Sequence, residues 1–559
     1  MLQQLFVGAP GREISVVYRY HGPTAPAVVI CPGLGNSMSE PRYLFSILAR
    51  QAYDAGFSTF QFDYVGDGDS SGDCRATSWC GILESGEQVI GLARKLGAPA
   101  IHLVGYGMGN LVAGMLESHS AVHSLALINP RFAIFSKAAQ QDWKDLRRSC
   151  NSNGEIYPAQ APDGSFANSL WEAIVGEPFV PTQPCGPLSV ALIDELLEMK
   201  SPSTLYRSGK PIFIVSERQE DRLACGGGDP PQYFQLVQHT ASRYKPTWHW
   251  CADCRALILS STTDFLLAQM TKGDSEGCDW RTPPPDAAVS DGRSLSSVAV
   301  NSHLRSLVAE VAGEQVLAVV HLPKAAIARD LCVIYEAGMP GQRVDIHRCG
   351  PRLATLLVNQ GFFVCRYDPR GMGVSAGEFH RTTWTSRLAD CLTMIELLSQ
   401  EFAERQLRFA IVGHSAGARV ACLAANREER MLACITWGPV MIEPSERIGE
   451  HQIRRHPSGS LVTEYCGLWM GINYNLDERR YDFLKEFRCC RKPGLVAFAD
   501  GDREHNPENE KLLTAIVAEQ PEKELIRFAG PHGFSPEAFT VLLTQTTEWL
   551  VRFDSHLQA

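Results

Sequence analysis

Short apolar runs alternate with amphipathic stretches along most of the chain. Stretches with helical periodicity include Arg352–Gln360, Thr385–Leu398 and Gly417–Arg427. Strands that alternate with helices predict a mostly parallel sheet with helices on both of its faces. In the second half of the chain, six runs have the length and composition of buried strands: Leu331–Tyr335, Phe362–Tyr367, Arg408–Val412, Ala433–Trp437, Gly494–Ala499 and Glu524–Phe528.

This pattern occurs twice. An apolar run leads into Gly33 in the first half and into Gly338 in the second half, and these glycines are 305 positions apart. A later strand ends in an aromatic residue and an aspartate, and these aspartates, Asp63 and Asp368, are also 305 positions apart. The period is far too long for a solenoid, so we interpret it as the tandem duplication of a whole domain.

A segment between the two copies has the composition of a linker. Residues 271–297 contain Pro283-Pro-Pro285, several glycines and serines, and little hydrophobic periodicity. We therefore predict a first domain over residues 1–270 and a second over residues 298–559. In the second domain, about residues 438–493 form an insertion between two predicted strands, which we expect to be a cap.

Composition excludes several classes of protein. The 559 residues include 52 Lys and Arg against 62 Asp and Glu, a formal charge of −10, which argues against a nucleic-acid-coating protein. With 45% hydrophobic and 20% charged residues the chain reads as globular. It has no apolar run of about 18 residues and no recognisable secretory signal, so we expect a cytoplasmic protein without a membrane span, whose cysteines stay reduced.

A nucleophile motif is present in the second copy. The strand that ends at Val412 leads into Gly413-His-Ser415-Ala-Gly417, and a helix follows. This is the G-x-S-x-G sequence of a sharp strand-to-helix turn that exposes a serine hydroxyl. We predict Ser415 as the nucleophile and the backbone N–H groups of Ala416 and Met339 as an oxyanion hole.

The partners of such a serine follow in the order acid and then histidine. The sequence after the strand at 494–499 offers Asp502 as the acid, with Asp500 and Glu504 as alternatives. After the last strand, His532 lies between glycine-rich neighbours and is the predicted general base, with His505 as the alternative.

The first copy keeps the frame of this motif but not its chemistry. Its sequence is Gly105-Tyr-Gly107-Met-Gly109, so a glycine stands at the nucleophile position. We expect a pseudo-hydrolase domain there. Asp221 and His249 are either relics of the other partners or unrelated residues.

These motifs make both halves resemble the α/β-hydrolase superfamily. The second half resembles the type 1 hydrolases associated with bacterial exosortase systems, through Gly341–Arg348, Tyr367–Gly373 and Gly413–Gly417. The first half resembles the type 2 form, through Gly66–Asp73. The resemblance implies two tandem α/β-hydrolase domains, each with a mostly parallel sheet, flanking helices and a cap insertion, with Ser415, Asp502 and His532 as the catalytic triad of the second.

The expected activity is that of a serine esterase or thioesterase acting through an acyl-serine intermediate. Analogy with thioesterases of the superfamily suggests a carrier-bound acyl chain, and an acyl or peptidyl carrier protein as a partner. Tyr465, Trp469 and Met470 of the cap either line an acyl pocket or form the cap's own core. The alternatives are an acyltransferase or cyclase that uses the same triad, and a non-catalytic scaffold. No cofactor, no metal and no nucleic acid is expected.

Overall fold

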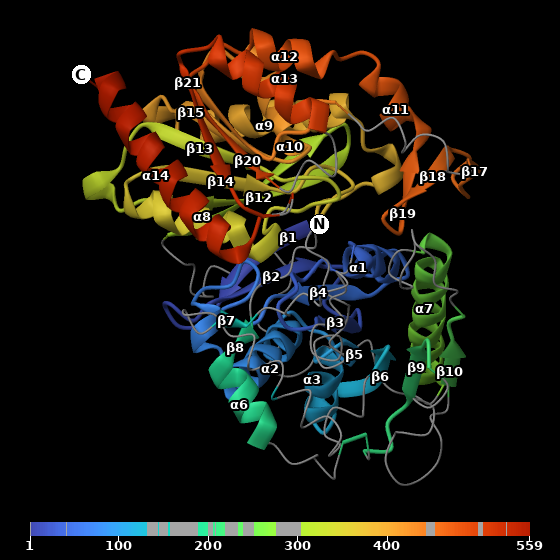
Figure 1. Cartoon of the computed structure of the whole chain (residues 1–559). Coiled ribbons are helices and arrows are strands. Elements are labelled where there is room, and N and C mark those ends of the chain that lie inside the picture. Colours follow the sequence, from blue (N-terminus) through green and yellow to red (C-terminus); the bar gives the residue numbers. More distant parts are fainter. Residues whose placement is uncertain are drawn as a thin grey trace. The chain divides into compact units, whose positions relative to one another are not determined.

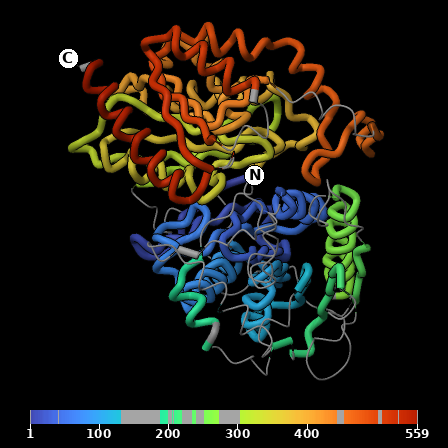
Figure 2. The backbone as a smooth tube through the Cα atoms, viewed as in Figure 1, coloured from blue at the N-terminus to red at the C-terminus, as the bar shows by residue number. Residues whose placement is uncertain are grey.

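The structure is a computed structural model. It describes residues 2–40, 42–130, 144, 155–156, 188–198, 205–206, 208–218, 233–238, 251–275, 303–442, 453–500, 507–530, 532 and 534–558. The chain divides into two compact units, residues 1–180 with 185–301 and residues 302–559 with 181–184. Figures 1 and 2 show that each unit is built around a sheet with helices packed against it.

The second unit contains an eight-stranded sheet in the order β11-β12-β14-β13-β15-β16-β20-β21. β12 pairs antiparallel with both of its neighbours, and every pair from β14 to β21 is parallel. The strands are β11 (Leu304–Val311), β12 (Glu314–His321), β13 (Leu331–Glu336), β14 (Phe363–Tyr367), β15 (Arg408–His414), β16 (Met431–Trp437), β20 (Gly494–Ala499) and β21 (Lys523–Phe528).

Helices cover both faces of this sheet. α8 and α14 pack on one face, where Leu353, Phe539 and Leu542 join alternate strand residues in a single apolar core. α9 and α10 pack together and contact the cap helices α11 and α12. The helices are α8 (Cys349–Asn359), α9 (Trp384–Glu401), α10 (Gly417–Arg427), α11 (Ile472–Glu478), α12 (Phe483–Cys489), α13 (Pro507–Ala518) and α14 (Pro536–Gln558).

The first unit has a sheet of the same topology, in the order β1-β2-β4-β3-β5-β6-β9-β10. Its strands are β1 (Leu2–Val7), β2 (Ile14–Arg19), β3 (Ala27–Cys31), β4 (Ser58–Phe62), β5 (Ile101–Tyr106), β6 (Val122–Ile128), β9 (Ile212–Ser216) and β10 (Tyr233–Leu236). Its helices are α1 (Leu44–Asp54), α2 (Trp79–Lys95), α3 (Gly109–Leu116), α6 (Val190–Glu198) and α7 (Ala252–Ser275). A short pair, β7 (Glu155–Ile156) and β8 (Leu188–Ser189), lies outside the main sheet.

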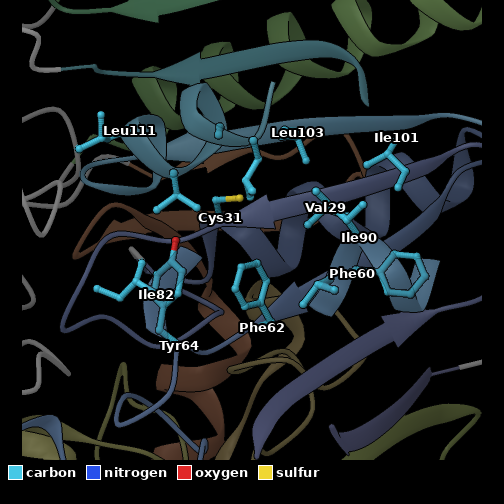
Figure 3. Close-up of a cluster of buried hydrophobic side chains, with 14 of the residues drawn as sticks. Val29, Cys31, Phe60, Phe62, Tyr64, Ile82, Ile90, Ile101, Leu103 and Leu111 are labelled. Atoms are coloured by element: carbon cyan, nitrogen blue, oxygen red, sulfur yellow. The ribbon is translucent and has the colours of Figure 1, made fainter. Parts of the chain in front are cut away.

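Apolar side chains from β3, β4, β5, α2 and α3 form one core of this unit (Figure 3). The predicted fold class, two tandem domains that each contain a mostly parallel sheet flanked by helices, is confirmed. α7 extends to Ser275, beyond the predicted start of the linker.

The insertion of the second unit forms a small structure of its own. A three-stranded antiparallel sheet, β17 (Arg454–Arg455), β18 (Leu461–Tyr465) and β19 (Leu468–Gly471), precedes α11 and α12. The Asp477 carboxylate in α11 accepts hydrogen bonds from the backbone N and the Oγ1 of Thr385, at 2.6 and 2.8 Å. Arg419 of α10 forms an ion pair of 2.7 Å with Glu478. These contacts fix the cap to the helices on either side of the nucleophile turn.

None of the helices in the described parts of the chain combines the length and the apolar character that a membrane span requires.

Candidate active site

The turn between β15 and α10 holds Ser415 in a left-handed conformation, with φ of +52°. Two neighbours must be glycine for this turn to close. A Cβ atom on Gly413 would lie 2.6 Å from the carbonyl oxygen of Gly417, and one on Gly417 would lie 2.3 Å from the carbonyl oxygen of Glu336. The G-x-S-x-G spacing is thus a steric requirement of the fold at this point.

His532 lies opposite this serine. Its Nε2 atom is 2.8 Å from the Oγ atom of Ser415, although the two residues are 117 positions apart. The histidine follows β21 and lies over Gly438, where an added Cβ would be 3.4 Å from the imidazole Cε1 atom. The structure therefore brings together the serine and the histidine that the sequence pairs.

The third member of the predicted triad is an acid expected after β20. Asp502 and the alternatives Glu504 and His505 lie outside the described residues. Asp500, the other alternative, directly follows β20. The position of that strand beside β21 agrees with an acid supplied from this end of the sheet.

The loop after β13 passes directly against the serine. An added Cβ on Gly338 would lie 3.3 Å from Cβ and 3.8 Å from Oγ of Ser415. Met339 follows in this loop, and its carbonyl oxygen accepts a hydrogen bond of 3.3 Å from the Tyr465 hydroxyl. Ala416 is the N-cap residue of α10. Ala416 thus follows Ser415 in the chain, and Met339 follows the glycine that lies against Ser415.

The register of the cap sheet separates the three predicted substrate contacts. Thr463 pairs with Met470, Glu464 with Trp469, and Tyr465 with Leu468. Since side chains alternate across a sheet, Tyr465 and Met470 share one face, and Trp469 lies on the other. The Arg454 guanidinium stacks on the Trp469 ring at 5.7 Å. The structure therefore places two of the three on the face that contacts the loop after β13.

Two buried ion pairs lie in the second unit, and the sequence did not reveal them as pairs. Glu336 pairs with Arg387 at 2.6 Å, and both side chains are fully buried. Arg343 pairs with Asp368 at 2.9 Å. Buried charges of this kind need partners within the fold. For Glu336 and Arg387, the sequence signal was a charged residue at a position where the strand or helix pattern calls for an apolar one. Asp368 was singled out in the sequence only as a marker of the repeat.

A further buried pair involves His414, the residue before Ser415. His414 Nδ1 lies 3.0 Å from the Asp345 carboxylate, which also accepts a hydrogen bond of 2.7 Å from the Tyr335 hydroxyl. Burial acts to raise the pKa of Asp345, but His414 and these hydrogen bonds hold that pKa below its usual range. Burial lowers the pKa of the neighbouring His347 to about 3. The contacts of Asp345 therefore favour its ionised form.

The corresponding turn of the first unit has the same shape without the serine. Gly107 has φ of +55°, and an added Cβ on Gly109 would lie 2.0 Å from the carbonyl oxygen of Cys31. Asn129, with φ of +46°, takes the place that Gly438 has in the second unit. Its backbone N donates to Val215, as that of Gly438 donates to Ala497. Asp221 and His249 lie outside the described residues.

Among the residues that the structure describes, no three His, Cys, Asp or Glu side chains gather in a way that would hold a metal ion.

Comparison with known families finds one match, and it lies in the second unit. Residues 345–458 match the family model described as serine aminopeptidase, S33, a segment that includes the turn at Ser415. No curated protein matches the chain.

Solved structures with similar folds include esterases and a thioesterase domain. Est1E from Butyrivibrio proteoclasticus, with ferulic acid bound, is 18% identical over 44% of this chain and 98% of its own, with a TM-score of 0.37. The esterase Pf2001 of Pyrococcus furiosus is 16% identical over 44% of this chain and 90% of its own, with a TM-score of 0.35. The thioesterase domain from the curacin biosynthetic pathway is 16% identical over 44% of this chain and 98% of its own, with a TM-score of 0.32.

Proposed function

We propose that the second unit is a serine hydrolase that cleaves an acyl ester or thioester through an acyl-serine intermediate. The observation that carries this proposal is the 2.8 Å contact between Ser415 Oγ and His532 Nε2. It occurs at a residue held at positive φ at the carboxyl end of a central strand. A serine with an adjacent base, exposed on such a turn, is the arrangement of an activated nucleophile.

The proposed reaction has two steps. His532 Nε2 accepts the Ser415 hydroxyl proton while Oγ attacks the substrate carbonyl carbon. The resulting oxyanion accepts hydrogen bonds from the backbone N–H groups of Ala416 and Met339. The leaving alcohol or thiol takes the proton from His532, and the acyl group stays on Oγ. Water then attacks the acyl carbon while His532 accepts one of its protons. The bond between the acyl carbon and Oγ breaks, His532 returns the proton to Oγ, and the acid is released.

Asp502 is proposed to accept the Nδ1–H of His532 and to stabilise the imidazolium that forms. The first unit is proposed to be a pseudo-hydrolase, because Gly107 supplies no nucleophile. A carrier-bound acyl chain is the proposed thioester substrate, with the carrier as the partner, and the cytoplasm is the proposed location.

The proposal is tested with p-nitrophenyl esters and acyl thioesters that carry the same acyl chains. Comparing kcat/KM for the ester and the thioester of one chain identifies the bond that the enzyme prefers. Ser415→Ala is expected to lower kcat by at least about 10³-fold. The control is Ser555→Ala, which changes a serine on α14 whose hydroxyl bonds to the Val551 carbonyl. Equal activity of Ser415→Ala and wild type would refute the proposal.

A further inference from the structure

A fully buried polar network lies behind the loop that passes Ser415. Arg387 Nη2 and Nε donate to Oε1 of Glu336 at 2.6 and 3.0 Å, and the Tyr367 hydroxyl donates to Oε2 of the same carboxylate. Glu336 and Arg387 are wholly buried and Tyr367 nearly so. The network joins the end of β13 to the end of β14 and the first turn of α9.

This network also contacts the loop itself. Arg387 Nη2 donates to the carbonyl oxygen of Ala337 at 2.6 Å, and Nη1 lies 3.9 Å from the sulfur of Met339. The Ala337 carbonyl belongs to the peptide that leads into Gly338, which lies against Ser415. Arg387 therefore fixes the orientation of the peptides that lead to the proposed oxyanion donor.

The first unit provides an internal comparison. Cys31 is paired with Gly105 in its sheet as Glu336 is paired with Gly413, so the two residues are equivalent. Phe62 ends β4 as Tyr367 ends β14, and Ile82 is the fourth residue of α2 as Arg387 is of α9. Cys31, Phe62 and Ile82 are all buried in one apolar cluster (Figure 3).

The copy without a nucleophile thus replaces all three polar side chains by apolar ones and keeps the fold. Burying a carboxylate and a guanidinium requires their desolvation, and apolar residues in place of a buried ion pair are often neutral or stabilising. Fold stability alone therefore does not account for the network in the second copy. Its presence there coincides with the serine.

We propose that Glu336, Tyr367 and Arg387 are positioning residues that hold the loop 337–339 where its N–H group meets the oxyanion. This inference rests on the proposed function of Ser415. Because the loop acts on the charge that develops in the transition state, losing its position lowers kcat more than it changes KM.

The test transplants the apolar set of the first copy into the second. The triple variant Glu336→Cys, Tyr367→Phe, Arg387→Ile is expected to unfold in urea at a midpoint equal to or above that of wild type. Its kcat for a p-nitrophenyl ester is expected to fall about 10- to 100-fold, with KM changed less than about threefold. Its rate of modification by a fluorophosphonate is expected to fall in parallel.

The control removes another ion pair of the same unit, in which the aspartate side chain is fully buried and the arginine side chain is 22% exposed. Arg329 pairs with Asp554 at 2.6 Å near the start of β13, at the opposite end of that strand from Glu336. Arg329→Met with Asp554→Leu is expected to leave kcat within about twofold of wild type. If the triple variant fails to fold, Tyr367→Phe alone, which removes one hydrogen bond to Glu336, is expected to lower kcat at unchanged KM.

A folded triple variant, or a Tyr367→Phe variant, with the kcat of wild type would overturn the inference, provided that Ser415→Ala abolishes activity in the same assay. Activity that persists in Ser415→Ala would instead overturn the proposed function on which the inference rests.

Discussion

Gly107 and Ser415 occupy equivalent turns of the two units and have nearly the same left-handed backbone conformation, with φ of +55° and +52°. In each turn the first flanking glycine is required by contact with the backbone of the turn itself, and the second by contact with the end of the neighbouring strand. The first unit has therefore kept the strained turn without the side chain that gives the turn its chemical use. The backbone is a property of the fold, and the activity is a property of the residues placed on it.

Restoring a serine to the first unit should not restore a reactive site. Gly107→Ser is expected to fold, because Ser415 tolerates the same φ. It should remain unmodified by a fluorophosphonate, since Asn129 stands where Gly438 leaves room for the His532 ring. Peptide mass mapping of Gly107→Ser in a Ser415→Ala background measures this directly. Modification of the new serine would show that the first unit retains a working base.

Gly417 should not tolerate a methyl group. In Gly417→Ala the added Cβ would lie 2.3 Å from the backbone oxygen of Glu336, so the turn must shift, at a cost of roughly 1–3 kcal/mol and with loss of most esterase activity. Urea unfolding and ester hydrolysis measure the two effects.

The matched control is Gly91→Ala in the interior of α2, where an added Cβ meets no atom within 4 Å. This change is expected to stabilise the first unit by about 0.5–1 kcal/mol. Equal effects of the two substitutions on the free energy of unfolding and on ester hydrolysis would show that the close contact at Gly417 does not restrict the residue at this position.

The two faces of the cap sheet should differ in their effect on substrate. Met470→Ala is expected to raise KM for a long-chain ester several-fold, because Met470 shares its face with Tyr465, which reaches the Met339 carbonyl. Trp469→Ala, on the opposite face, should leave KM within about twofold of wild type. Steady-state kinetics over a series of chain lengths compare the variants, and the reverse order would refute the assignment of faces.

Acid should destabilise the first unit through His102. Burial lowers the pKa of this histidine to about 3, and its Nδ1 atom lies 2.8 Å from the Ser124 hydroxyl. The unfolded chain takes up this proton near pH 6.5, whereas the folded unit does not until about pH 3. The contribution of His102 to the free energy of unfolding is thus complete above pH 6.5. It is lost as the pH falls from 6.5 towards 3, at about 1.4 kcal/mol per pH unit.

His102→Gln should remove this dependence. Its free energy of unfolding in urea is expected to fall less between pH 6.5 and pH 5.5 than that of wild type, by about the amount expected for one proton. Burial also lowers the pKa of His347 to about 3 and that of His380 to about 4, so both histidines of the second unit contribute to the pH dependence that remains in the variant. Identical slopes for wild type and His102→Gln would contradict this account.

The sequence allowed the central strands and the serine–histidine contact to be predicted, for physical reasons. Strands buried on both faces appear as continuous apolar runs, so the run at 408–412 and the turn after it were recognisable. The first two strands of each sheet, such as β11 and β12, were missed because their pairing is antiparallel and β11 is only partly buried. Ser415 and His532 followed from the fixed order of the triad along this fold.

The buried ion pair and the faces of the cap sheet could not be predicted, because they depend on how distant segments pack together. Glu336 and Arg387 are single charges in the sequence and become a buried pair only when β13 and α9 meet. The separation of Trp469 from Met470 depends on the register of the cap sheet, because a shift by one residue exchanges the faces.

The most direct test of the central claim is modification of the full chain by a fluorophosphonate, followed by peptide mass mapping, on wild type and Ser415→Ala. The account predicts one adduct, on Ser415, and none on the variant. An adduct on another serine, or no adduct on folded wild-type protein under conditions that saturate a known serine hydrolase, would contradict it.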